Sequence, residues 1–166
     1  MFKGQPYIGV IGAGECTPAE AAMAEEVGRE LARRGAVIVC GGLGGVMEAA
    51  ARGAQAAGGL VIGILPGWDP AEGNKYLTVA LATGLGEARN AVITRTCDGL
   101  IAIAGGYGTL AEIGLALKMN KPVVGLGTWE ARTSDGRAIP VLQVATPQDA
   151  VASIFRLLRL APKLRY

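Results

Sequence analysis

The 166-residue sequence contains no histidine. This absence excludes Ser-His-Asp triads, Cys-His pairs and metal sites built on imidazole ligands. Any chemistry must use carboxylates, arginine, tyrosine, backbone amides or a bound cofactor. No motif in the sequence calls for a particular metal or cofactor, so neither is expected.

Charged and aromatic residues are also scarce, at 18% and 5% of the chain. The net charge is +2, and the basic residues form no cluster in the sequence. Nucleic acid is therefore not an expected partner. The longest apolar runs are only strand-length, the N-terminus enters a strand directly without a signal peptide, and no membrane span is expected. Three widely spaced cysteines, Cys16, Cys40 and Cys97, are typical of reduced thiols in a cytoplasmic protein.

Hydrophobic residues, in contrast, make up 51% of the chain. Short runs rich in β-branched residues alternate with segments of helical pattern. The strand-like runs are apolar almost throughout, as strands buried on both faces are. This alternation predicts one α/β domain over residues 1–166, Rossmann-like, with three layers and a mostly parallel sheet between helices. Strands are expected at 7–11, 36–40, 60–65, 77–81, 99–103, 122–126 and 140–144, and helices at about 17–34, 46–57, 87–96, 109–119 and 146–160.

Three helix starts carry capping patterns, at Thr17–Glu20, Thr109–Glu112 and Thr146–Asp149. Two longer loops, 66–76 and 128–138, are candidates for lids or ordinary surface loops. Arginine outnumbers lysine and asparagine is rare, which hints at a heat-adapted source.

Glycine-rich loops follow three of the expected strands, as 12-GAG-14, 41-GGLGG-45 and 105-GGYG-108. In an open α/β sheet all three lie at the carboxyl ends of the strands, where ligands bind. Glycine permits close backbone approach, and the helix N-terminus after each loop favours a phosphate. The set predicts a site for a phosphorylated small molecule. The alternative is that these glycines serve only tight turns.

Two common nucleotide motifs are absent. A dinucleotide fingerprint would need a third glycine where Thr17 stands, and an acidic residue after the strand that ends at Cys40. A P-loop would need a Gly-Lys pair, and the sequence has none. NAD and ATPase roles are therefore disfavoured.

The stretch 105-GGYGTLAE-112 resembles the GGxGTxxE motif of the Lonely Guy proteins, which are often mislabelled lysine decarboxylases. The opening GAG, 41-GGLGGVM-47 and 88-ARNAVI-93 follow in that family's order, so the resemblance covers most of the chain. It implies a Rossmann-like homo-oligomer that hydrolyses the N-glycosidic bond of a nucleoside 5′-monophosphate to free base and ribose 5-phosphate. Decarboxylation is excluded because no lysine lies in a glycine loop to form a Schiff base with pyridoxal phosphate.

The resemblance also implies roles for particular residues. Arg89 and Glu112 would be catalytic, with Glu112 ionised at a helix N-terminus and stabilising an oxocarbenium-like transition state. Gly105, Gly106, Gly108 and Thr109 would cradle the phosphate. Beyond what the resemblance implies, the other residues expected to bind the nucleotide are Gly12, Gly14, Gly41, Gly42, Gly45, Asn90 and Tyr107.

Three positions depart from the family pattern. Asn90 replaces a lysine, Ala104 a proline, and Glu48 a glycine. The changes at Asn90 and Glu48 are expected to alter the pocket, which is typical of a side branch. The main alternative is a non-catalytic nucleotide or cofactor protein, such as a molybdenum-cofactor carrier or a sensor. A pure scaffold would leave the three glycine loops unexplained.

Several other residues have two interpretations. Cys16 stands at a helix start that could lower its pKa, but is expected to be a packing residue. Tyr107 could stack on a base or pack its own loop, and Asp69 and Glu72 could border the pocket or lie on the surface. Asp98 is at the amino end of a strand and is expected to serve a turn.

The final helix is apolar around much of its circumference, and the third helix offers a small, apolar surface through Ala91, Val92 and Ile93. Part of this area is expected to meet another subunit, most simply in a homodimer or a multiple of it. The final helix contributes Val151, Ile154, Phe155, Leu157, Leu158 and Leu160 to this expectation.

Overall fold

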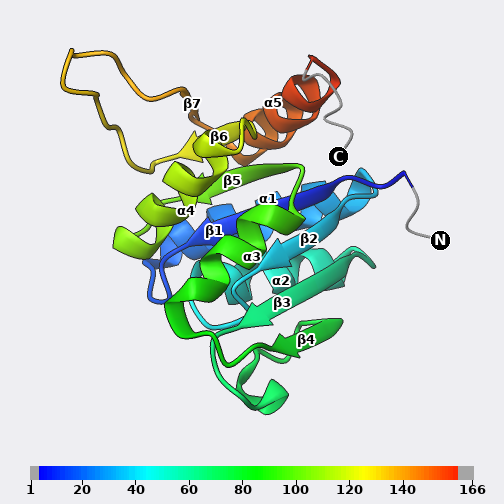
Figure 1. Ribbon diagram of the computed structural model, residues 1–166. Helices are drawn as coiled ribbons and strands as arrows, with labels where there is room; N and C mark the ends of the chain where they lie inside the picture. The colour runs from blue at the N-terminus through cyan, green and yellow to red at the C-terminus, as the bar shows by residue number, and fades with distance from the viewer. Residues whose placement is uncertain (1–3, 161–166) are drawn as a thin grey trace.

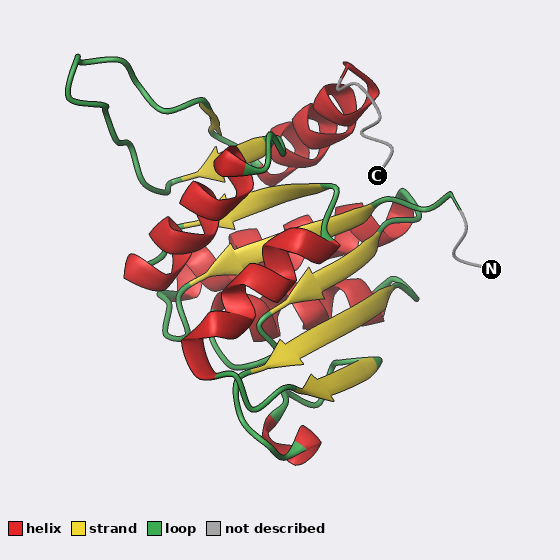
Figure 2. Ribbon diagram, viewed as in Figure 1, coloured by secondary structure: helices red, strands yellow, loops and turns green. Residues whose placement is uncertain are grey.

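A computed structural model describes residues 4–160, except for the side chain of Leu160. Seven strands form one sheet in the order β4-β3-β2-β1-β5-β6-β7, and every neighbouring pair is parallel (Figures 1 and 2). The predicted α/β architecture is confirmed. The strands are β1 (Tyr7–Gly12), β2 (Val37–Cys40), β3 (Leu60–Leu65), β4 (Val79–Ala82), β5 (Gly99–Ile103), β6 (Val123–Leu126) and β7 (Val141–Val144).

Helices cover both faces of the sheet. One layer contains α1, α2 and α5, and α3 and α4 lie side by side on the opposite face (Figure 1). The helices are α1 (Pro18–Arg33), α2 (Val46–Ala56), α3 (Arg89–Thr96), α4 (Tyr107–Lys118) and α5 (Pro147–Leu160), with short 3-10 turns η1 (Pro70–Glu72) and η2 (Gly86–Ala88).

The chain order places the topological switch point between β1 and β5, which are neighbours at the centre of the sheet. From β1 the strand order runs outward one way through β2, β3 and β4, and the other way through β5, β6 and β7. The loops after β1 and β5 enter helices on opposite faces of the sheet. In open α/β sheets this arrangement leaves room for a ligand between the two loops, at the carboxyl ends of the strands.

The central strands are buried as predicted, with β2 and β5 inaccessible along their whole length. The edge strands differ from that expectation. Exposed and half-buried residues alternate in β4, and the two central residues of β7 are exposed. Both are edge strands, which have a neighbouring strand on only one side.

Helix α1 packs on α2 with its backbone unusually close. A Cβ atom on Gly28 would lie 2.0 Å from the carbonyl oxygen of Ala50, and one on Gly53 would lie 1.9 Å from that of Glu25. These glycines therefore set the distance between the two helices. The sequence pattern gave no sign of this role.

Two predicted caps are confirmed. At α1, Thr17 accepts a hydrogen bond from the N–H of Glu20, and the Glu20 carboxylate accepts one from the N–H of Thr17. Thr146 accepts a hydrogen bond from the N–H of Asp149 at the start of α5. The C-terminal end of α3 is held by a lysine side chain. Lys121 Nζ donates to the backbone carbonyls of Thr94, Arg95 and Cys97.

Much of the apolar surface of α5 packs against the core, so less of it is left for a subunit contact than the sequence predicts. Val151 and Ile154 are fully buried, while Phe155, Leu157 and Leu158 are half-buried against the core. The side chain of Leu160 lies outside the described residues. The helix is apolar on several sides because it fills the angle between α1 and the β5–β6 part of the sheet.

The three cysteines are free thiols. Burial and the nearby Glu20 raise the pKa of Cys16, which overturns the idea that the helix start activates it. Cys16 packs against the core instead. Between residues 4 and 160 no helix combines the length and apolar character needed to cross a bilayer.

Candidate functional site

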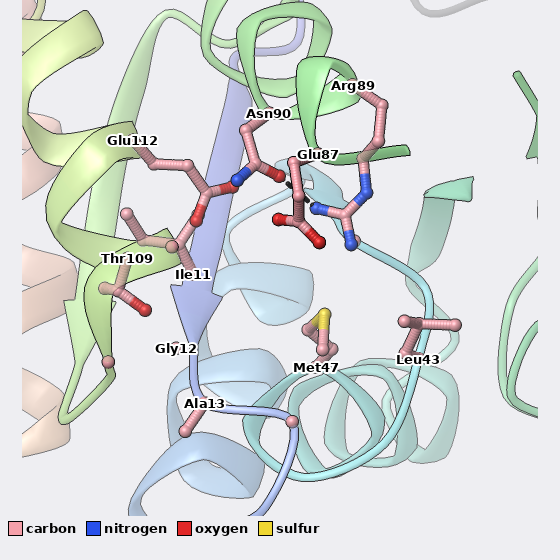
Figure 3. Close-up of a pocket in the computed structure, with 14 residues that line it drawn as sticks. Ile11, Gly12, Ala13, Leu43, Met47, Glu87, Arg89, Asn90, Thr109 and Glu112 are labelled. Atoms are coloured by element: carbon pink, nitrogen blue, oxygen red, sulfur yellow. Dashed lines mark hydrogen bonds between the residues drawn. The ribbon is translucent and has the colours of Figure 1, made fainter. Parts of the chain in front are cut away.

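A cavity of about 310 Å³ opens at the carboxyl ends of β1 and β2, between the N-termini of α3 and α4 (Figure 3). Its apolar wall comes mainly from Ile11, Leu43 and Met47. Its polar lining is Glu87, Arg89, Asn90, Thr109 and Glu112, and the glycines that border it are Gly12, Gly14, Gly41, Gly106 and Gly108.

Nine of the thirteen predicted site residues thus line one cavity, although they come from four separate segments of the chain. The other four do not. Gly42 faces Leu65 and Gly45 abuts the backbone of the β1 loop, so both shape the turn into α2. The remaining two, Gly105 and Tyr107, lie beyond this cavity: Gly105 borders a second one, and the Tyr107 side chain is 83% exposed.

Glu112 is not part of a helix cap. Helix α4 begins at Tyr107, its N-cap is Gly106, and no side chain caps it. Thr109 is therefore already inside the first turn, and Glu112 belongs to the second. The predicted capping box at Thr109–Glu112 is wrong because the glycines let the helix start two residues earlier.

The Glu112 side chain is directed into the cavity and is only 6% exposed (Figure 3). Its carboxyl makes no hydrogen bond or ion pair with any residue between 4 and 160. Burial raises its pKa to about 7, the positive charge of Arg89 lowers it, and the negative charge of Glu87 raises it. This direction runs against the expectation of an ionised Glu112, because desolvation raises the pKa more than the Arg89 charge lowers it.

Arg89 begins α3 and is 91% buried, being 9% exposed. One guanidinium nitrogen, Nη1, donates to the side-chain oxygen of Asn90, whereas the buried Nε has no hydrogen-bond partner within the described chain. No ion pair joins Arg89 to Glu112 in residues 4–160. A buried guanidinium with an unused donor is costly unless an anion completes its contacts.

Gly41 makes room for this guanidinium. A Cβ atom at position 41 would lie 2.7 Å from Arg89 Nη2 and 2.6 Å from Met47 Sδ. The second glycine loop is held from outside the cavity by Asn74, whose side chain donates to the carbonyls of Gly42 and Leu43 at 3.2 and 2.9 Å. Asn74 was not predicted, because nothing in its sequence context distinguishes it from an ordinary loop residue.

The start of α4 supplies the other half of an anion site. The backbone N–H groups from Gly105 to Thr109 make no hydrogen bond within residues 4–160, as expected at an uncapped helix N-terminus. A Cβ atom at Gly106 would meet no atom within 4 Å, so this stretch is open to a ligand. Free N–H groups and the helix dipole favour an anion at this end of the cavity.

The three departures from the Lonely Guy pattern have different consequences. Ala104 has φ of +47°, and its N–H donates to the carbonyl of Leu126 at 3.2 Å. Proline allows neither, so the glycine loop here follows a path that the family's proline would forbid. Asn90 holds Arg89, as described above. Glu48 does not line the cavity, which corrects the expectation that it alters the pocket.

The remaining candidates lie elsewhere. Asp69 caps η1 by accepting from the N–H of Ala71 at 2.8 Å, and neither Asp69 nor Glu72 lines the cavity. The prediction for Asp98 is confirmed, since it accepts from the N–H of Tyr7 at 2.8 Å at the amino end of the sheet. Loop 128–138 extends away from the domain and contains a single bridge between Arg132 and Ala138 (Figure 1).

Sequence reasoning missed Glu87, which lies beside the Arg89 guanidinium in Figure 3. It also missed the apolar wall of Leu43 and Met47. The only available signal for Glu87 was its place two residues before Arg89. The 3-10 turn η2, which brings Glu87 to the cavity, has no clear sequence signature.

A family profile matches residues 5–151, which is most of the chain, and its description is the SLOG cluster4 family. The chain belongs to the SLOG cluster4 family. A protein of unassigned function from Archaeoglobus fulgidus is 49% identical over 119 residues, which cover 72% of this chain and 78% of that protein.

Two solved structures resemble this SLOG cluster4 chain along nearly their whole length. The molybdenum cofactor binding protein of Rippkaea orientalis is 37% identical, with a TM-score of 0.85, and the match covers 93% of this chain and 98% of that one. The molybdenum cofactor carrier protein of Chlamydomonas reinhardtii is 34% identical, with a TM-score of 0.79 and coverage of 93% and 99%.

The Lonely Guy relationship is more distant. A rice protein described as a probable cytokinin riboside 5′-monophosphate phosphoribohydrolase is 38% identical over 93 residues. That match covers 54% of this SLOG cluster4 chain and only 38% of the rice protein. The shared part therefore spans well under half of the enzyme-like relative.

Proposed function

We propose that this protein binds a small phosphorylated heterocycle, either a nucleotide or the molybdenum cofactor, and carries or senses it without transforming it. The observation that carries the proposal is the buried Arg89 guanidinium, whose Nε is unsatisfied within the described chain. It lines the same cavity as the uncapped start of α4. A phosphate there would accept from both sets of donors.

The residues present suit a phosphorylated pterin such as the molybdenum cofactor. Arg89, the N–H groups from Gly105 to Thr109 and the Thr109 hydroxyl would hold the phosphate, and the ring would lie against the apolar wall. Among the described residues no cluster of three or more carboxylates and thiols could bind a metal ion. Molybdenum would therefore travel as part of the cargo, kept by the cofactor's own ligands.

Binding without turnover is favoured over hydrolysis by two considerations. The relatives whose names state cofactor binding match 93% of this chain, whereas the hydrolase-like relative matches only 54% of it. The left-handed backbone at Ala104 also gives the phosphate loop a shape that the phosphoribohydrolase pattern, with its proline, does not allow.

Phosphoribohydrolase activity is the second candidate, and Glu112 is the observation that favours it. A carboxyl with a pKa of about 7 beside a phosphate site can act as acid or base at neutral pH. In that reaction the bond from ribose C1′ to the base nitrogen breaks, water adds to C1′, and the base leaves with a proton. Ionised Glu112 would stabilise the oxocarbenium-like state or take the proton of the attacking water.

One experiment separates the two candidates. Purified protein is incubated with each nucleoside 5′-monophosphate and, separately, with molybdenum cofactor, and both ligand retention and ribose 5-phosphate release are measured. The proposal expects retention of at least one ligand with no ribose 5-phosphate above the level given by Glu112→Gln. Release that Glu112→Gln abolishes would replace the carrier function with hydrolysis. Retention of none of these compounds would reject the site.

We also propose that the protein assembles as a two-fold pair through the α3–α4 face. Val92 of α3 is exposed, and Gly114 of α4 has open space in front of it. Such a pair would place the interface next to the cavity, whose lining includes the starts of both helices.

A further inference from the structure

A second cavity, of about 560 Å³, lies on the other side of the α4 N-terminus from the first. The loops after β5 and β6 and the start of α1 border it, through Gly105, Trp129 and Glu20, and it is a shallow depression open to solvent. The two cavities share Ala13 and Gly106, so they meet at the uncapped turn where the phosphate is proposed to lie.

This shared border falls at the topological switch point of the sheet. The first cavity opens toward β2, the second toward β6, and the loops after β1 and β5 lie between them. In open α/β sheets a crevice at this point can hold a ligand whose two halves occupy the two sides. A mononucleotide would fill only one side.

We propose that the ligand has two ring-bearing halves joined through phosphate, and that the second cavity holds a guanine-type or pterin-type ring. This inference rests on the proposed phosphate site, and it adds the size and ring chemistry of the ligand. The first half lies beside Glu112, the bridging phosphate lies at Gly106, and the second ring lies against Trp129.

Trp129 lines the second cavity, and its indole is held in place by several contacts. Its Nε1 donates to the carbonyl of Gly106 at 3.0 Å, and its own carbonyl accepts from the side chain of Gln143 at 3.0 Å. The Tyr107 ring packs against it with centroids 5.7 Å apart, although Tyr107 does not line the cavity. An aromatic ring fixed in this way is suited to stack on a flat heterocycle.

The charges of the second cavity specify what kind of ring it accepts. Its ionisable lining is Glu15 and Glu20, with no lysine or arginine. Glu20 Oε2 is engaged by the N–H of Thr17, whereas Glu15 is exposed and has no partner within residues 4–160. Ionised carboxylates only accept hydrogen bonds, so a second phosphate is disfavoured and a ring edge rich in N–H donors is favoured. Guanine and pterin each present a ring N–H and an amino group side by side, which a carboxylate can bind with both oxygens.

The test compares four probes by calorimetry: ribose 5-phosphate, GMP, and dinucleotides in which two guanosines or two adenosines are joined through a 5′,5′-diphosphate. The diguanosine compound is expected to bind at least about tenfold more tightly than either GMP or the diadenosine compound. In Glu15→Gln that advantage is expected to fall at least about fivefold, while ribose 5-phosphate affinity stays unchanged. The matched control is Glu130→Gln, an exposed neighbour of Trp129 that does not line the cavity, and it should behave as wild type.

A fluorescence readout checks the position of the ring. The chain has two tryptophans, and Trp68→Phe leaves Trp129 as the only one. Diguanosine dinucleotide is expected to quench its emission, and ribose 5-phosphate is not.

Equal affinity for GMP and the dinucleotide, or an unchanged advantage in Glu15→Gln, would overturn the inference and leave the phosphate site intact. Failure of all four probes would overturn this inference, and failure to retain molybdenum cofactor as well would reject the phosphate site.

Discussion

The two helical layers use glycine in opposite ways. Between α1 and α2, a Cβ atom on Gly28 or Gly53 would lie about 2 Å from a backbone carbonyl oxygen of the facing helix. No larger residue therefore fits at either position. On the α3–α4 side, Cβ atoms at Gly106 and Gly114 would meet nothing within 4 Å, and one at Gly108 would meet only Asn90, at 3.8 Å. The first layer is closed by its own packing, and the second is left open for something outside the chain.

The largest effect is expected from Gly28→Ala, which should force α1 away from α2. The added methyl would meet a carbonyl that belongs to a helix and cannot move alone, so we expect a loss of about 3 kcal/mol in the free energy of unfolding. Urea unfolding measures it, and Gly114→Ala in α4 is the matched control, expected to stabilise by about 0.5 kcal/mol. Similar losses of unfolding free energy in Gly28→Ala and Gly114→Ala would show that the two helical layers are packed equally tightly.

A second large effect is expected from pH, through Glu112. Its pKa of about 7 lies above the ordinary glutamate value of 4.5, so the folded state holds this proton more tightly than the unfolded state. The contribution of Glu112 to stability is therefore fully present below about pH 4.5 and is lost as pH rises through 7, by up to about 3 kcal/mol. With no histidine in the chain, few other side chains titrate in this range.

The corresponding measurement is urea unfolding at several pH values between 5 and 8. Glu112→Gln should flatten the profile of the unfolding free energy in this window, while the exposed Glu130→Gln should leave it unchanged. A wild-type profile that is already flat would mean that Glu112 is ionised at pH 5, and its burial would then have to be offset by a partner.

These predictions also mark the boundary of what the sequence specifies. Apolar runs and caps predicted the seven strands and five helices to within about two residues, because burial and capping are local patterns. The glycine loops predicted the cavity, because parallel strands bring their carboxyl ends together. The start of α4 at Tyr107, the raised pKa of Glu112 and the contacts of Gly28 were missed, since each depends on what a distant segment places nearby.

The open α3–α4 layer should also show itself in the assembly state. Light scattering coupled to size exclusion is expected to give twice the monomer mass of 16.9 kDa, or a multiple of that pair. Val92→Lys should shift the mass toward the monomer without loss of fold, because Val92 is exposed on α3. A wild-type monomer at micromolar concentration would show that this layer stays open in water.

A smaller effect on stability is expected from Ala104→Gly. A non-glycine residue with φ of +47° is strained, and glycine relieves that strain. We expect a gain of about 0.5 kcal/mol in urea unfolding, whereas Ala104→Pro should be strongly destabilising because it also removes the N–H bond to Leu126. A loss of stability in Ala104→Gly would mean that the methyl group packs more favourably than the left-handed backbone costs.

The most direct test of the central claim is a thermal-shift comparison of phosphorylated and dephosphorylated ligands in wild type, Gly108→Ala and Arg89→Gln. The panel holds the nucleoside 5′-monophosphates, their nucleosides and molybdenum cofactor. We predict that at least one phosphorylated compound raises the Tm of wild type and that the nucleosides do not. Gly108→Ala should keep or raise the Tm of the free protein yet lose the ligand shift, and Arg89→Gln should also lose the shift. An equal shift from a nucleoside and its monophosphate, or a full shift in Arg89→Gln, would contradict a phosphate site at Arg89 and the α4 N-terminus.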